Sequence, residues 1–60
     1  MFTLTISTDN AAFDDDAVFD EISRILIEVA AKMRSHVKWG TLRDVNGNAV
    51  GMFELEQRKS

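Results

Sequence analysis

A single stretch of helical periodicity, residues 17–35, most constrains what this chain can fold into. Its apolar residues recur at three- and four-residue spacing and form one wide face, as in an amphipathic helix. They are Val18, Phe19, Ile22, Ile25, Leu26, Val29, Ala30 and Met33. Asp16 is the expected N-cap, and Asp14 and Asp15 add negative charge near the positive end of the helix dipole. A helix of about 19 residues is about 28 Å long, enough to cover one face of a small sheet.

The segments on either side of this helix have strand patterns instead. Residues 2–8 alternate apolar and polar, which predicts a half-buried strand with Phe2, Leu4 and Ile6 facing inward. Residues 37–55 predict a hairpin, because Asn46-Gly47 is the strongest short signal for a two-residue turn. The chain is therefore expected to be one α+β domain, residues 1–60. Its order is βαββ, with a three-stranded, mainly antiparallel sheet and one helix packed on one face.

A two-residue turn fixes which hairpin side chains share a face. The expected inner face, under the helix, holds Ala49, Leu42, Phe53 and Leu55, with Phe53 lying across Gly40. The expected outer face consists of Val37, Trp39, Thr41, Arg43, Val50, Met52 and Glu54. The first strand could pair with the third strand (antiparallel) or the second (parallel). The antiparallel arrangement is favoured because such sheets tolerate one uncovered face.

Composition excludes several kinds of site. The chain has no Cys and only one His, His36, so disulfides, thiolate zinc sites and multi-histidine metal sites are excluded. The acidic run that starts at Asp9 lacks the ligand spacing of a calcium loop, and helix capping explains it more simply. A nuclease that uses His36 with Lys38 or Arg43 is the enzyme alternative, but a histidine at a helix end is the plainer interpretation. No enzyme activity, metal or cofactor is expected.

Charge and hydropathy narrow the possible partners. Residues 1–23 carry six acidic and no basic side chains, whereas residues 24–60 carry seven basic and four acidic ones, for a net charge of −3. A net-acidic chain is a poor candidate for direct nucleic-acid binding, which requires neutralising phosphates. The sequence has no pattern of a signal peptide and no apolar run of membrane-spanning length. A cytoplasmic protein without a membrane partner is expected.

The outer sheet face is the candidate binding site, because one helix covers only one side of the sheet. Aromatic residues, Met and Arg are enriched at protein interfaces, and leaving them in water is unusual. The residues expected to bind a partner there are Trp39, Thr41, Arg43, Val50 and Met52. The alternative is that threonines and charged residues dilute the patch, with Trp39 resting on the arm of Arg43. An acidic helix entrance could add a second contact, through Asp14, Asp15, Asp16 and Asp20.

Two motifs, TDNAAF at residues 8–13 and LRDVNGNAVG at residues 42–51, resemble those of short uncharacterised proteins encoded by bacteriophages and prophages. The resemblance implies no activity or catalytic residue, because that family has none established. It implies a phage protein in the host cytoplasm that binds and inhibits a host defence protein, as anti-CRISPR proteins do. The alternative is a homodimeric accessory phage protein with two sheets packed back to back.

Overall fold

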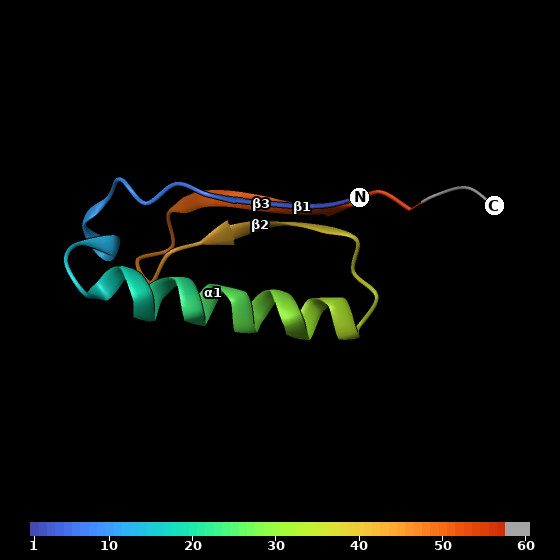
Figure 1. Ribbon diagram of the computed structural model, residues 1–60, viewed down its shortest axis with the longest axis horizontal. Coiled ribbons are helices and arrows are strands. Elements are labelled where there is room, and N and C mark those ends of the chain that lie inside the picture. The colour runs from blue at the N-terminus through green and yellow to red at the C-terminus, as the bar shows by residue number, and fades with distance from the viewer. Residues whose placement is uncertain (58–60) are drawn as a thin grey trace.

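The computed structural model describes residues 1–57. The element order is β1 (Phe2–Ile6), a 3-10 turn η1 (Ala11–Phe13), α1 (Ala17–Arg34), β2 (Trp39–Arg43) and β3 (Ala49–Leu55). In the described chain the strands form one sheet in the order β1-β3-β2, and both neighbouring pairs are antiparallel. α1 runs along one face of this sheet (Figure 1). The α+β, βαββ prediction and the antiparallel placement of β1 beside β3 are confirmed.

Backbone groups, rather than side chains, shape both ends of α1. Asp16 is the N-cap residue as predicted, but among residues 1–57 its side chain makes no capping hydrogen bond, so the expected capping role is wrong. The Asp14 carbonyl accepts from the Ala17 N–H instead, at 3.0 Å. At the other end His36 has a positive φ of 63°, and the Val37 N–H donates to the Lys32 carbonyl at 3.0 Å. His36 thus occupies the left-handed position that glycine usually takes after a helix.

The hairpin register agrees with the prediction only in its first part. Strand pairs from Trp39/Glu54 to Leu42/Gly51 are as expected, but Arg43 then pairs with Ala49 because Val50 is an extra residue in β3. The cause is a three-residue loop, residues 45–47, closed by an Asp44 N–H bond to the Asn48 carbonyl at 2.9 Å. The predicted two-residue turn is therefore wrong, since a three-residue loop with a bulge is a different hairpin class.

This bulge changes the face of two side chains. Val50, which was expected on the outer face, is only 7% exposed and belongs to the core, whereas Ala49 is exposed. Both expectations are wrong for the same reason: one inserted residue reverses the alternation of side chains along a strand.

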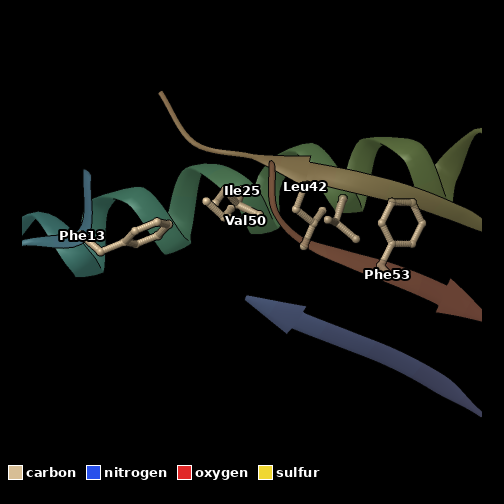
Figure 2. Packing of buried hydrophobic residues seen from close by; sticks show 6 residues of the cluster. Phe13, Ile25, Leu42, Val50 and Phe53 are labelled. Atoms are coloured by element: carbon tan, nitrogen blue, oxygen red, sulfur yellow. The ribbon is translucent and has the colours of Figure 1, made fainter. Parts of the chain in front are cut away.

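The core lies between α1 and the hairpin strands, as Figure 2 shows. Its buried hydrophobic residues are Phe13, Ile25, Val29, Leu42, Val50 and Phe53. Phe53 is fully buried, and its ring lies against Gly40, where an added Cβ would approach Cε1 to 2.8 Å. The predicted inward positions of Leu42 and Phe53 are confirmed. β1 supplies none of the buried hydrophobic residues in the described chain; Leu4 and Ile6 are half-buried against the core.

Two buried carboxylates hold the hairpin loop in place. Asp44 accepts hydrogen bonds from the backbone N–H groups of Asn46 and Asn48, each at 2.9 Å, and from Nδ2 of Asn10 at 2.8 Å. Glu21, on α1, accepts from the Val45 N–H at 2.8 Å and from Nε of Arg24.

Arg24 extends this network to the edge of the sheet. Its Nη2 donates to the Arg43 carbonyl at 3.0 Å, and its Nη1 donates to Glu28 at 2.9 Å. One flank of α1 is thereby tied to both the loop and the outer edge of β2.

Both carboxylates are set to stabilise the fold in their ionised form. The hydrogen bond from Arg24 is the main reason that the pKa of Glu21 lies below its ordinary value of 4.5, although burial opposes it. Burial also raises the pKa of Asp44, but hydrogen bonds from Asn48, Asn46 and Asn10 outweigh it and hold that pKa below 3.8. A carboxylate whose pKa is lowered by folding stabilises the protein at pH values above its ordinary pKa. This stabilisation is lost as the pH falls through the folded-state pKa.

We therefore expect the urea midpoint to fall when the pH is lowered from 7 to about 3, because this takes the pH below the ordinary pKa values of both carboxylates, where their stabilisation is progressively lost. Glu21→Gln with Asp44→Asn removes both titrating groups. The urea midpoint of this variant is therefore expected to be lower than that of wild type at pH 7, but to fall less on acidification. Urea titrations monitored by circular dichroism at the two pH values measure this. An equal loss in wild type and variant would contradict the assignment.

Candidate functional site

The outer sheet face consists of two rows of side chains on the side of the sheet opposite α1. Strand pairing places Thr3, Glu54 and Trp39 in one row, and Thr5, Met52 and Thr41 in the next. All six residues are exposed, because α1, the only α-helix among residues 1–57, lies against the other face. The outer sheet face is thus made up of Thr3, Thr5, Trp39, Thr41, Met52 and Glu54.

Trp39 and Met52 are the two large apolar side chains of this face. Trp39 is 68% exposed and Met52 is 48% exposed. They are diagonal neighbours across β2 and β3, a relation in which long and aromatic side chains come within reach of one another. The predicted placement of Trp39, Thr41 and Met52 on one uncovered face is confirmed, and the two apolar groups form a small patch bordered by threonines.

Arg43 does not lie beside Trp39. It is four residues further along β2, about 13 Å away at the rise of a strand. Its Nη1 donates to the Gly47 carbonyl at 3.1 Å, which directs the guanidinium toward the hairpin loop. The alternative in which the arm of Arg43 shields Trp39 is therefore wrong. Neither Arg43 nor the buried Val50, both of which were predicted to bind a partner, is part of the patch.

The acidic helix entrance is a separate surface. Asp14, Asp15, Asp16 and Asp20 are all exposed, as a binding role would require. They lie at the start of α1, whereas Trp39 follows its end, and an 18-residue helix is about 27 Å long. The structure does not bring the acidic residues and the outer sheet face together.

A shallow cavity of about 270 Å³ opens at the end of the molecule where α1 finishes. It is lined by Met33, His36, Val37, Lys38, Leu55 and Gln57. Its volume falls just below the range of about 300–1,000 Å³ typical of small-molecule sites. Within residues 1–57 no three carboxylate or histidine side chains gather as a metal site.

A second group of exposed apolar residues was not anticipated from the sequence. Phe19 and Leu26 were assigned to the buried face of the helix, but both are exposed, as is Phe2 at the start of β1. Ile27, by contrast, is exposed on the solvent side of α1, where the helical periodicity places it. The helix pattern marks these positions as apolar, but it does not show how far across the sheet α1 reaches.

Comparison with known proteins finds no matching family model, no similar curated protein and no similar solved structure. The resemblance to short phage proteins therefore stays a prediction. No helix within residues 1–57 is long and apolar enough to cross a membrane.

Proposed function

We propose that this protein is a non-catalytic binding module that contacts another protein through its outer sheet face. The exposure of Trp39 and Met52 side by side, on the face that α1 leaves uncovered, carries the proposal. An aromatic ring and a flexible thioether provide the apolar centre that protein interfaces favour. The surrounding threonines and Glu54 supply hydrogen-bonding groups for a polar rim.

The proposal extends to the partner: a host defence protein that is inhibited when the outer sheet face binds it. The four exposed aspartates at the helix entrance support a partner with a basic surface, such as a nucleic-acid channel. Opposite charges steer encounter and raise the association rate more than the final affinity. Since the aspartates lie far from Trp39, their role is steering or a second contact.

The experiment is affinity capture from a bacterial lysate with tagged wild type and two variants. Trp39→Ala with Met52→Ala removes the apolar patch. Ile27→Ala is the matched control, because Ile27 is 71% exposed on the other side of the molecule. We expect a captured protein to be retained by wild type and the control and to be lost, by at least about tenfold, in the double variant. Circular dichroism checks that both variants remain folded.

Two outcomes would contradict the proposal. One is capture of the same proteins by the double variant as by wild type. The other is dissociation of a self-associated wild type by the same double substitution, with no foreign protein captured, which would assign the outer sheet face to a second copy of the chain.

A further inference from the structure

β1 forms one edge of the described sheet, and its outward-facing backbone groups can be identified from the hydrogen bonds on its other side. The Met1 amino group donates to the Glu56 carbonyl at 2.7 Å, the Glu56 N–H donates back at 2.9 Å, and the Ser7 N–H donates to the Val50 carbonyl at 2.7 Å. Odd-numbered residues of the strand thus bond toward β3. Since bonding alternates along an antiparallel pair, the N–H and C=O groups of Phe2, Leu4 and Ile6 point to the free edge.

The two edges of the sheet are chemically different. At the β2 edge, Arg24 from α1 already donates to the outward-facing Arg43 carbonyl. β1, by contrast, reads Phe-Thr-Leu-Thr-Ile, with no charged residue and no proline. Native proteins protect a sheet edge with charges, proline or a covering segment, because an open edge is a template for pairing with another strand. The β1 sequence contains neither a charge nor a proline.

The flank of α1 on the β1 side is also unprotected. At about 100° per residue, the flank that carries Arg24 lies at the β2 edge, and the opposite flank lies toward β1. Apart from Ser23, the residues on that opposite flank are apolar: they are Phe19, Ile22, Leu26, Ala30 and Met33. Leu26 is 46% exposed, and Phe19 is exposed too. Together with the inward side chains of β1 they form what we call the β1 strip, consisting of Phe2, Leu4, Ile6, Phe19 and Leu26.

The sequence of β1 is complementary to itself. In an antiparallel pairing centred on Leu4, Leu4 of one copy faces Leu4 of the other, and Phe2 faces Ile6. These three residues are the ones whose backbone groups point outward, so this register pairs all of their N–H and C=O groups. Thr3 then faces Thr5, and no like charges meet across the two-fold axis.

We propose that the protein forms a two-fold symmetric dimer in which two β1 strands pair and the two β1 strips pack against each other. The same patch serves both copies, as in any isologous interface. A stable interface buries about 800 Å² per partner, roughly a sixth of the 4700 Å² surface of this chain. A chain of this size has a small core, and self-association is a common means of stabilising one. The dimer goes beyond the proposed function, because it leaves both outer sheet faces uncovered.

The test compares two adjacent helix positions. Leu26→Lys places a charge in the β1 strip, whereas Ile27→Lys places the same charge on the solvent side of α1. Sedimentation equilibrium over a dilution series gives the dimer dissociation constant of each variant. We expect Leu26→Lys to raise that constant at least about tenfold and Ile27→Lys to change it by less than about twofold.

A charge-swap experiment tests the register itself. Thr3 and Thr5 are exposed in the monomer but face one another in the dimer. Chains with Thr3→Lys and Thr5→Lys are expected to be monomeric, as are chains with Thr3→Glu and Thr5→Glu, because like charges are then directly opposed. An equimolar mixture of the two variants is expected to restore the dimer.

Three results would overturn the dimer. They are a monomeric wild type at every concentration up to about 1 mM, a dimer that survives Leu26→Lys, and a charge-swap mixture that stays monomeric. Trp39→Ala with Met52→Ala separates this inference from the proposed function: it is expected to leave the dimer intact while abolishing partner capture. A dimer lost in that variant but kept in Leu26→Lys would place self-association on the outer sheet face instead.

Discussion

Gly51→Ala is expected to leave the protein largely unfolded in the absence of denaturant. A Cβ at this position would overlap the Thr5 carbonyl oxygen and lie 2.8 Å from the Thr5 carbonyl carbon and 3.1 Å from Cα of Ile6. These are backbone atoms of β1, which cannot turn aside as a side chain can. Relief would require β1 to separate from β3, and a domain of this size has only about 3–5 kcal/mol of net stability to lose. Far-ultraviolet circular dichroism and a urea titration measure the effect.

Gly47→Ala is the matched control for this substitution. Gly47 has a φ of 84°, but no atom lies within 4 Å of a Cβ built there. The same added methyl group therefore meets only the left-handed backbone penalty, about 1–2 kcal/mol, and the variant is expected to fold with a lower urea midpoint. If Gly51→Ala were as stable as Gly47→Ala, the close approach of β3 to β1 would be contradicted.

The fold was predictable because the hydrophobic period changes cleanly along the chain. Alternation before Asp9, helical spacing from Val18 to Met33 and an Asn-Gly turn between two strand-like segments leave few ways to bury one apolar helix face. Antiparallel pairing of β1 with β3 followed from the uncovered face of the sheet. Each of these steps uses only local pattern and general rules of strand pairing.

The hairpin loop was not predictable from its own residues. Asn46-Gly47 fits a two-residue turn, but it also fits a three-residue loop in which only Gly47 takes a positive φ. Contacts from residues distant in the sequence favour the second arrangement: Glu21 binds the Val45 N–H and Asn10 binds the Asp44 carboxylate. Those contacts require the helix and the η1 segment to be in place, so the burial of Val50 could not be inferred from the hairpin alone.

The exposed apolar residues were also predictable only in part. The outward direction of Trp39 and Met52 follows from strand alternation in the regular part of the hairpin, which lies on the side of the bulge away from the loop. The exposure of Leu26 depends instead on where α1 lies across the sheet. Arg24 and Glu21 tie the helix to β2 and to the loop, so the helix flank toward β1 is left less covered. A helix pattern gives the width of an apolar face but not the position of the sheet beneath it.

Phe53→Ala has the second of the two largest expected effects. Phe53 is fully buried, lies 6.2 Å from the Phe2 ring between centroids, and has Nζ of Lys32 5.9 Å above its ring. Replacing a buried Phe with Ala costs about 3–5 kcal/mol, because the lost transfer free energy adds to the cost of the cavity. This equals the whole stability expected for the domain, so the variant is expected to be mostly unfolded. Ile27→Ala removes an exposed side chain on the solvent side of α1 and is expected to change the urea midpoint little.

A double-substitution cycle isolates the contact between the Phe53 ring and Gly40. Gly40→Ala alone is expected to cost about 1–3 kcal/mol, because the new Cβ would lie 2.8 Å from Cε1 of a ring that has no room to move. With Phe53→Leu the ring is gone, so Gly40→Ala should cost much less in that background, giving a coupling energy of about 1 kcal/mol or more. Additive losses would show that the ring does not rest on Gly40. Phe53 would then not point inward as described. Since side chains alternate along a strand, the outward direction of the adjacent Met52 would be contradicted too.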